Sequence, residues 1–227
     1  MTGPGPQQLT IKIDHAGSVS GLLTRPPKPH ACFVFAHGAG AGMIHPFMEK
    51  VAAGLGERQL ATLRYQFPYM EKGSKRPDSP AVAHAAVRAA VAEAARRCEG
   101  VPLIAGGKSF GGRMTSQAQA LQPLTGVRGL AFFGFPLHPA GKPSNERAKH
   151  LADIHVPMLF LQGTRDALAE PALLEPVVKS LGSSATLRPV RDADHSFHVL
   201  ARSGRHDGEV MNEILDAFAA WAGVIVR

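Results

Sequence analysis

The chain has 227 residues, of which 44% are hydrophobic and 19% charged, a composition typical of a globular protein with one sizeable core. Its net charge is +7, yet the Lys and Arg residues occur singly or in pairs without interleaved aromatic residues, which argues against a nucleic-acid-binding protein. Two cysteines, Cys32 and Cys98, give neither a disulfide framework nor metal-ligand spacing, so we expect a reducing compartment.

The sequence lacks the patterns expected of a signal peptide and of a membrane-spanning helix. The opening MTGPGPQQLTIKI has neither the basic start nor the apolar run of a signal peptide, and no apolar stretch approaches the roughly 18 residues of a membrane span. We therefore expect a soluble, cytoplasmic protein with one domain over residues 1–227 and no membrane partner. No pattern in the sequence indicates its oligomeric state.

The predicted strands fall into two classes along the chain. Residues 9–14 and 18–25 are short alternating stretches around Ala16-Gly17, which predicts an antiparallel hairpin. Later stretches are continuous apolar runs, which are expected of strands buried on both faces of a parallel sheet. These runs are 31–40, 60–67, 101–109, 127–135 and 156–164, and a sixth run, 185–190, follows them.

Helical patterns separate these runs. We expect helices over 46–57, from Ser79-Pro80 to near Gly100, after Gly112, over 171–180 and from about Asp207 to Trp221. Strand and helix alternate throughout, which predicts an α/β protein with an open, mostly parallel, doubly wound sheet and helices on both faces. About 20 residues separate the runs 127–135 and 156–164, too few for a large cap domain. In such sheets, functional residues gather at the carboxyl ends of the strands.

The segment 103–114, LIAGGKSFGGRM, fits two different motifs. Gly107-Lys108-Ser109 is the ending of a phosphate-binding P-loop, whereas Gly107 to Gly111 form the G-x-S-x-G of a serine nucleophile elbow. A P-loop needs a further glycine five residues before Gly107, where this chain has Pro102, and the intervening residues are typical of a buried strand. Glycines on both sides of Ser109 instead suit a sharp turn from strand to helix. We favour the elbow; a turn whose serine only caps a helix stays open.

A serine hydroxyl becomes a nucleophile when a histidine removes its proton and a carboxylate orients that histidine. In serine hydrolases built on such sheets, these residues follow in the order Ser, acid, His. Asp166 follows the run 156–164, and His195 follows the next run, so we predict Ser109, Asp166 and His195 as catalytic residues. Chain order disfavours His138, His150 and His155; position on or near the final helix disfavours His198 and His206; closeness to His195 disfavours Asp192 and Asp194.

An oxyanion hole needs two N–H groups, one from the residue after the serine and one from the loop after an earlier strand. Phe110 is expected to supply the first. The second is expected from the glycine-rich loop 37–42, with Ala39 as the single best candidate. His37 at the start of this loop is predicted to hold the loop by a hydrogen bond rather than to act in catalysis.

Further residues are expected near the mouth of the site. Arg64 and Tyr69 flank one strand end, and Arg113 follows the elbow. Each arginine could bind a substrate carboxylate or form a structural ion pair. Met43, Phe47 and Phe135 could line an apolar acyl pocket or pack in the core. We select Met43, Arg64, Tyr69 and Phe135 as candidate substrate-binding residues.

With these residues in place, the chain resembles the α/β-hydrolase superfamily, and within it the small, lidless, dienelactone-hydrolase-like branch. More narrowly, it is similar to a bacterial group related to animal proteins that include a chromatin-complex subunit. The resemblance spans about residues 30–221 and is carried by AHGAGAGMIHPFM, LRYQFPYME, GGKSFGGRM, FPLHPAGKP, LQGTRD and DADHSF, in this order.

The resemblance implies an α/β-hydrolase fold with Ser109, Asp166 and His195 as a triad, but it implies no substrate. Dienelactone hydrolases usually have a cysteine nucleophile, so the serine here favours ester or thioester chemistry. We expect a serine hydrolase of the carboxylesterase or thioesterase kind that cleaves a small ester or thioester through an acyl-enzyme, without metal or organic cofactor. The alternatives are a non-catalytic interaction module with the same fold and, more weakly, metal binding by Asp192, Asp194, His195 and His198.

Overall fold

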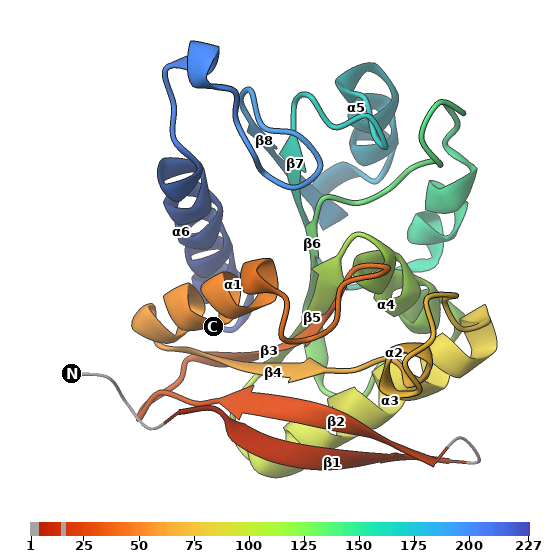
Figure 1. Ribbon diagram of the computed structural model, residues 1–227, viewed down its shortest axis with the longest axis vertical. Helices are drawn as coiled ribbons and strands as arrows, with labels where there is room; N and C mark the ends of the chain where they lie inside the picture. Colours follow the sequence, from red (N-terminus) through yellow and green to blue (C-terminus); the bar gives the residue numbers. More distant parts are fainter. Residues whose placement is uncertain (1–4, 15–16) are drawn as a thin grey trace.

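The computed structural model describes residues 5–14 and 17–227. Two earlier expectations fall on residues outside this range. They concern Ala16 of the hairpin turn and residues 1–4 of the N-terminal segment, which has no signal-peptide pattern. The described chain forms an eight-stranded sheet in the order β1-β2-β4-β3-β5-β6-β7-β8 (Figure 1). The strands are β1 (Gln7–Ile13), β2 (Gly17–Thr24), β3 (Ala31–Ala36), β4 (Leu60–Tyr65), β5 (Leu103–Lys108), β6 (Val127–Phe133), β7 (Met158–Gly163) and β8 (Ala185–Val190).

Strand pairing agrees with the two classes of strand predicted from the sequence. The alternating strands β1 and β2 form an antiparallel hairpin, and β2 also pairs antiparallel with β4. The other neighbouring pairs, from β4 through β8, are parallel. The carboxyl ends of β3, β5, β6, β7 and β8 therefore meet at one edge of the sheet.

Helices cover both faces of the sheet, as predicted (Figure 1). Helices α1 (Pro46–Glu57) and α6 (Asp207–Ile225) pack on one face, and α3 (Pro80–Arg97), α4 (Phe110–Leu121) and α5 (Pro171–Ser180) pack on the other. The side chains of β3 alternate between the two resulting apolar layers: Phe33 and Phe35 face α1 and α6, whereas Cys32 and Val34 face the other layer. Each fully buried Phe contributes roughly 1.5–3 kcal/mol.

The structure differs from the sequence prediction at several helix ends. Helix α4 begins at Phe110 rather than after Gly112, because Ser109 is the last non-helical residue and the glycines lie inside the first turn. A short helix that the sequence did not predict, α2 (Pro68–Glu71), begins with a proline. The 3-10 helices η1 (Glu146–Asp153), η2 (Gly182–Ser184) and η3 (Ala201–Ser203) were also not predicted. The final helix continues to Ile225.

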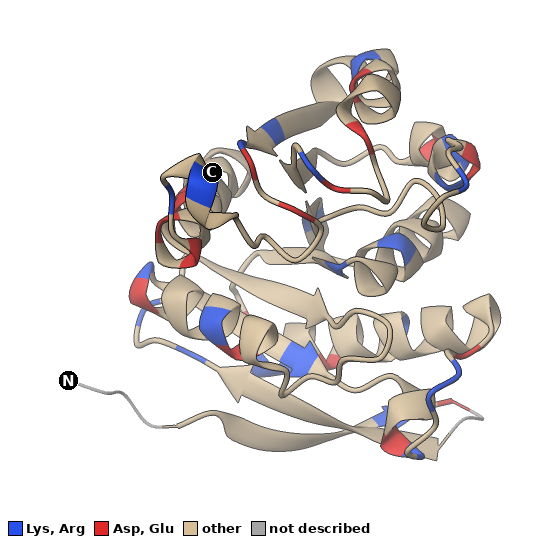
Figure 2. Cartoon of the chain, turned by 45° about the horizontal axis from the view of Figure 1, so that its top comes forward, with Lys and Arg blue, Asp and Glu red and all other residues tan. Residues whose placement is uncertain are grey.

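Charged residues are spread over the surface. Figure 2 shows Lys and Arg on helices, strands and loops, with Asp and Glu among them. Some arginines are paired locally, as where Arg96 and Arg97 bind Glu93 on α3. Among the described residues, no helix combines the length and the apolar character needed to cross a membrane.

Candidate active site

The turn from β5 to α4 is sharply bent at Ser109. This residue has φ +49° and ψ −115°, a backbone conformation that is rare for a residue with a side chain. A Cβ on Gly107 would lie 2.5 Å from the carbonyl oxygen of Ala36, and one on Gly111 would lie 2.6 Å from the same oxygen. The end of β3 thus passes so close to the turn that both positions require glycine, as the nucleophile-elbow interpretation expects.

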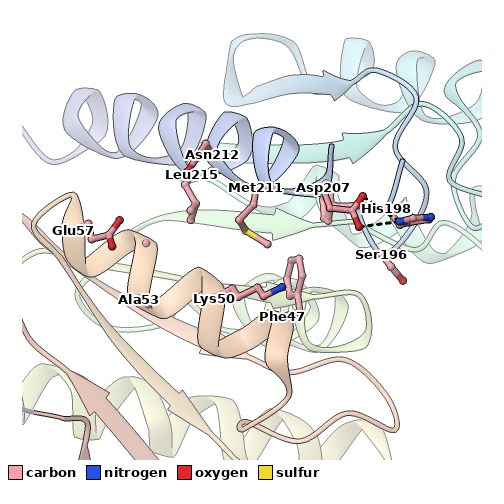
Figure 3. A pocket seen from close by; sticks show the side chains of 13 residues that line it. Phe47, Lys50, Ala53, Glu57, Ser196, His198, Asp207, Met211, Asn212 and Leu215 are labelled. Atoms are coloured by element: carbon pink, nitrogen blue, oxygen red, sulfur yellow. Dashed lines mark hydrogen bonds and ion pairs between the residues drawn. The ribbon is translucent and has the colours of Figure 1, made fainter. Parts of the chain in front are cut away.

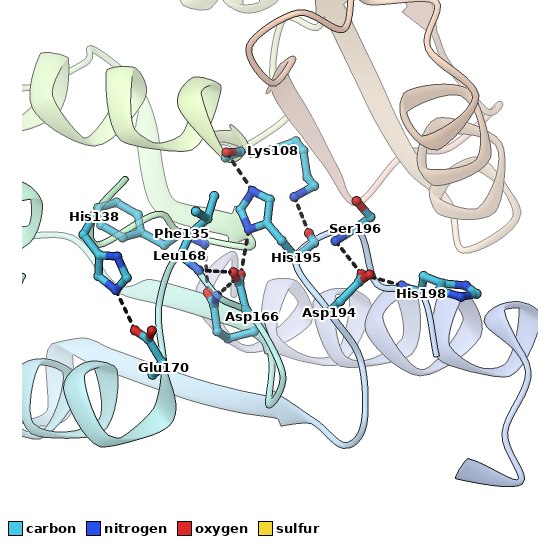
Figure 4. A network of polar contacts seen from close by, with 12 residues as sticks. Lys108, Phe135, His138, Asp166, Leu168, Glu170, Asp194, His195, Ser196 and His198 are labelled. Atoms are coloured by element: carbon cyan, nitrogen blue, oxygen red, sulfur yellow. Dashed lines mark hydrogen bonds and ion pairs between the residues drawn. The ribbon is translucent and has the colours of Figure 1, made fainter. Parts of the chain in front are cut away.

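The structure brings the three predicted catalytic side chains into one chain of hydrogen bonds. His195 Nε2 lies 2.9 Å from Ser109 Oγ, and His195 Nδ1 lies 2.7 Å from Asp166 Oδ2 (Figure 4). Asp166 follows β7, and His195 lies in the loop between β8 and α6. The Asp166 side chain is fully buried, whereas that of His195 is 24% exposed and so remains open to a substrate.

The Asp166 carboxylate is held by two further donors. Gln162 Nε2 donates to Oδ2 at 2.5 Å, and the Leu168 backbone N–H donates to Oδ1 at 2.8 Å. The other end of the Gln162 amide accepts the N–H of Phe135. Because an ionised carboxylate only accepts, His195 Nδ1 must carry the hydrogen in this contact, which leaves Nε2 free to accept the Ser109 proton.

Lys108 supports the histidine from the other side. Its Nζ donates to the backbone carbonyl of His195 at 2.6 Å and lies 5.8 and 5.7 Å from the ring centres of Phe47 and Phe197 (Figure 4). Burial lowers the pKa of Lys108 to about 8, although the Asp166 and Asp194 carboxylates oppose the shift. No role was predicted for Lys108 from the sequence. The only signal was its place next to the serine, in the variable position of the motif.

Two backbone N–H groups are available beside Ser109. Phe110 is the first residue of α4, where a helix leaves its N–H groups without internal acceptors. Ala39 lies in the loop after β3, where Ala41 donates to Gly38 and Gly40 donates to the Tyr69 hydroxyl. Neither the Phe110 nor the Ala39 N–H has a protein acceptor in the described part of the chain. Both residues line a cavity that contains Ser109.

His37 fixes the base of this loop by contacts of the kind that the sequence predicted. Its Nε2 accepts the Phe67 N–H at 3.0 Å, so its Nδ1 carries the hydrogen and donates to the Gly38 carbonyl at 2.8 Å. The ring is fully buried. Removal from water lowers the pKa of His37 to about 4, although the Gly38 contact opposes the shift.

Acidification is therefore expected to destabilise the fold through His37. In the unfolded chain this residue takes up a proton as the pH falls below 6.5, whereas the folded protein keeps it neutral down to about pH 4. The unfolded state binds more protons in this window, so stability falls as the pH falls. Between pH 7 and 5, His37 alone should lower the free energy of unfolding by about 2 kcal/mol.

Urea unfolding at pH 7.0 and 5.0 measures this effect. The variant His37→Gln should lose less stability than the wild type between the two pH values, whatever its stability at pH 7. An equal loss in both proteins would contradict the assignment, because the proton uptake would then come from other groups.

The four candidate substrate-binding residues make supporting contacts instead. Arg64 is buried and its Nη1 donates to the Met43 carbonyl, and the Met43 N–H donates to Gln66. Tyr69 is buried and binds the loop at Gly40. Phe135 is fully buried and packs against the rings of Phe132 and Phe160. None of the four lines either of the cavities found at Ser109, and their substrate-binding role stays a prediction.

Two cavities flank Ser109, and both reach Ala39 and Leu168. The histidine-side cavity, of about 430 Å³, is lined by Phe47, Met48, Lys108 and His195. The arginine-side cavity, of about 450 Å³, is lined by Phe110, Arg113, Met114, Pro136 and Arg147. A substrate held at Ser109 therefore has space on two sides. Ala39, Ser109, Phe110 and His195 were selected from the sequence, and Phe47 and Arg113 were considered. No role was predicted for Met48, Met114, Pro136, Arg147 or Leu168, which come from separate loops and helices.

A third hollow, of about 630 Å³, lies between α1 and α6 and does not include Ser109 (Figure 3). His198 lies at its end and pairs with Asp207 at 2.9 Å. Asp194 accepts the N–H groups of Ser196 and His198, and His195 binds Asp166. The alternative metal cluster is therefore not assembled, and the described residues contain no group of three or more His, Cys, Asp or Glu side chains placed to hold a metal ion.

Comparison with known proteins places this geometry in a family. A family model described as "Alpha/beta hydrolase domain" matches residues 29–223. The structure is similar to dienelactone hydrolase from Anabaena variabilis, with a TM-score of 0.77 and 19% identity over 99% of this chain and 100% of that chain. It is also similar to XC6422 from Xanthomonas campestris, described as a serine hydrolase without lid, with a TM-score of 0.74 and 18% identity over 97% of each chain.

A third similar structure is the esterase domain of a Rhodothermus marinus protein, with a TM-score of 0.75 and 14% identity over 99% of this chain and 100% of that domain. Together these similarities confirm the expected fold: a mostly parallel sheet flanked by helices, without a cap domain. Because the family model covers most of the sequence, the chain belongs to the alpha/beta hydrolase domain family.

Proposed function

We propose that this protein is a serine hydrolase that cleaves a small carboxylic ester or thioester through an acyl-enzyme. The observation that carries the proposal is the continuous contact from Ser109 through His195 to Asp166, at a strained turn with two unbonded N–H groups beside it. Similar solved structures include an esterase domain and a serine hydrolase, which supports the same chemistry. One sheet carries all three side chains, so we treat residues 1–227 as one catalytic domain.

Each residue has one role in the proposed acylation step. Ser109 Oγ attacks the carbonyl carbon while His195 Nε2 takes its proton, and Asp166 stabilises the imidazolium that forms. The negative charge on the carbonyl oxygen is met by the N–H groups of Phe110 and Ala39. One such donor typically contributes about 2.7–4 kcal/mol to the stability of the transition state.

The second half of the reaction uses the same groups. The imidazolium gives its proton to the leaving alcohol or thiol as the bond to the acyl carbon breaks. Water then attacks the acyl-enzyme, and His195 takes one of its protons. When the intermediate collapses, Ser109 recovers its hydrogen and the carboxylic acid leaves. Protein groups suffice for every step of this scheme.

A fluorophosphonate probe tests whether Ser109 is activated. The folded protein is expected to be labelled at a single site, and mass spectrometry of the digested protein should place the label on Ser109, because its hydroxyl contacts an imidazole that Asp166 orients. The Ser116 hydroxyl also contacts an imidazole, that of His150, but it is fully buried and donates to the Arg113 carbonyl. Heat-denatured protein should not react. Label on another serine, or an unreactive folded protein, would count against the proposal and in favour of a non-catalytic interaction module.

A further inference from the structure

Two arginines lie together in the arginine-side cavity. Arg113 is in the first turn of α4, four residues after Ser109, and Arg147 lies on η1, which packs against α4. Both side chains are partly buried and line the cavity that contains Ser109. Removal from water lowers the pKa of both guanidinium groups, and the charge of Arg147 lowers that of Arg113 further.

Within the described residues, neither guanidinium forms an ion pair or a hydrogen bond with a protein acceptor, and Arg113 Nε is buried without any partner. The acidic side chains nearby are engaged elsewhere. Asp78 also lines this cavity, but its carboxylate accepts the Tyr69 N–H and, in the described structure, forms no ion pair with either arginine. Glu170 binds His138 at 2.6 Å, and Glu146 binds Lys149. Two like charges brought together without an ion-pair partner cost free energy, which an anionic ligand between them would offset.

The chemistry of the proposed reaction decides which part of the substrate enters this cavity. The leaving group must lie next to His195 Nε2 to receive its proton, and His195 lines the histidine-side cavity. The carbonyl oxygen must point to the N–H groups of Phe110 and Ala39. The remaining substituent of the carbonyl carbon, the acyl chain, is then directed away from His195 into the arginine-side cavity.

We propose that the acyl group carries a terminal carboxylate, so that the substrate is a monoester or monothioester of a dicarboxylic acid; this inference rests on the proposed hydrolase function. Phe110, Met114 and Pro136 line the path of the methylene chain. Arg113 lies with its guanidinium carbon 5.9 Å from the Phe110 ring centre. A guanidinium offers two parallel N–H groups that match the two oxygens of a carboxylate. Arg113 and Arg147 therefore act as the specificity-determining residues.

Paired esters that differ only at the end of the acyl chain test this inference. The wild-type protein is expected to have a kcat/KM for the mono-p-nitrophenyl ester of adipate about 10- to 100-fold higher than for p-nitrophenyl hexanoate. The same comparison with the p-nitrophenyl esters of glutarate and pentanoate, and of suberate and octanoate, locates the preferred length of the acyl chain. Hydrolysis without enzyme is subtracted in every case. A ratio near one between the kcat/KM values of the two esters in each pair, at every chain length, would overturn the inference while leaving the hydrolase proposal intact.

Substitutions connect the preference to the two arginines. Arg147→Met and Arg113→Met are each expected to lower the ratio about tenfold, and Arg113→Lys, which keeps the charge but loses the planar group, should lower it less. Arg188→Met is the matched control, because Arg188 is exposed on β8 and lies outside both cavities at Ser109. An unchanged ratio in both Arg→Met variants would contradict the proposal, even if the preference for adipate is real.

Binding without turnover separates this inference from the proposed function. In Ser109→Ala protein, adipate is expected to raise the melting temperature in a saturable way, and hexanoate is expected to raise it less. The double variant Ser109→Ala, Arg147→Met should lose most of the adipate effect. A protein that hydrolyses no ester but passes this test keeps the anion site and loses the hydrolase proposal. A protein that hydrolyses neutral esters but fails this test keeps the hydrolase proposal and loses the anion site.

Discussion

Replacing Ser109 with alanine is expected to lower kcat/KM for p-nitrophenyl acetate by roughly 10⁴-fold or more. The reason is geometric: Ser109 Oγ is the hydroxyl that lies 2.9 Å from His195 Nε2, beside the N–H groups of Phe110 and Ala39. In the proposed mechanism, no acyl-enzyme forms without this oxygen. The activity that remains can come only from water attacking a substrate held by the rest of the site.

The fold of Ser109→Ala should be unaffected, because Ser109 Oγ makes no hydrogen bond besides the one to His195 among the described residues. Ser180→Ala provides the matched control: Ser180 ends α5 on the surface and its hydroxyl binds the Val177 carbonyl. This variant should hydrolyse the ester at the wild-type rate. Turnover by purified Ser109→Ala at more than about one hundredth of the wild-type rate would show that another group performs the attack.

The sheet could be predicted because its strands carry strong local signals. Each buried parallel strand is a continuous apolar run, as in ACFVFA of β3, and the hairpin strands β1 and β2 alternate instead. The helix ends were predicted less accurately, because they depend on contacts between residues that are distant in the sequence. Helix α4 starts at Phe110, at a turn where the carbonyl of Ala36, distant in sequence, lies too close for a side chain at positions 107 and 111.

The residues now found in contact at the site could be selected because chain order and strand ends limit the choice. Asp166 and His195 are 29 residues apart, yet both follow strands whose carboxyl ends meet at one edge of the sheet. The roles of Lys108 and Gln162 could not be predicted, since each acts by a side-chain contact across a loop. The four substrate-binding candidates lie outside the two cavities at Ser109. An apolar or charged side chain near a strand end has the same sequence signature whether it lines a cavity or supports a loop.

Arg64 and Arg113 illustrate this limit. Both are arginines near strand ends, and both were open to the same two interpretations. In the structure, Arg64 is buried beneath the loop that carries Met43 and donates to that residue's carbonyl. Arg113 instead lines a cavity next to a second arginine. The cavity beside Arg113 could not be predicted, because one of its walls carries Arg147 on η1, a helix that the sequence did not predict and that packs against α4.

Changing Asp166 to asparagine is expected to lower kcat by about 10⁴-fold while the protein stays folded. The wild-type carboxylate accepts three hydrogen bonds, from His195 Nδ1, Gln162 Nε2 and the Leu168 N–H. An asparagine side chain has one accepting and one donating end. If its oxygen keeps the Leu168 contact, its NH₂ group faces His195 Nδ1 and forces that nitrogen to accept. The hydrogen then moves to Nε2, which can no longer take the Ser109 proton.

The imidazole tautomer distinguishes this explanation from a loss of structure. Nitrogen NMR of labelled histidine should show the hydrogen of His195 on Nδ1 in the wild type and on Nε2 in Asp166→Asn, with circular dichroism showing both proteins folded at the assay temperature. The melting temperature of the variant should be lower, because its NH₂ group also faces the Gln162 Nε2 donor. Asp192→Asn is the matched control, because Asp192 is the rival carboxylate three residues before His195 and its side chain pairs only with Arg191, at 3.5 Å, in the described structure. A large loss of activity in Asp192→Asn, together with a near-normal kcat in Asp166→Asn, would show that Asp192 rather than Asp166 orients the His195 imidazole. The buried position of Asp166, against the exposed pair at Asp192, argues for the opposite outcome, since a carboxylate shielded from water interacts more strongly with the imidazolium that forms during the reaction.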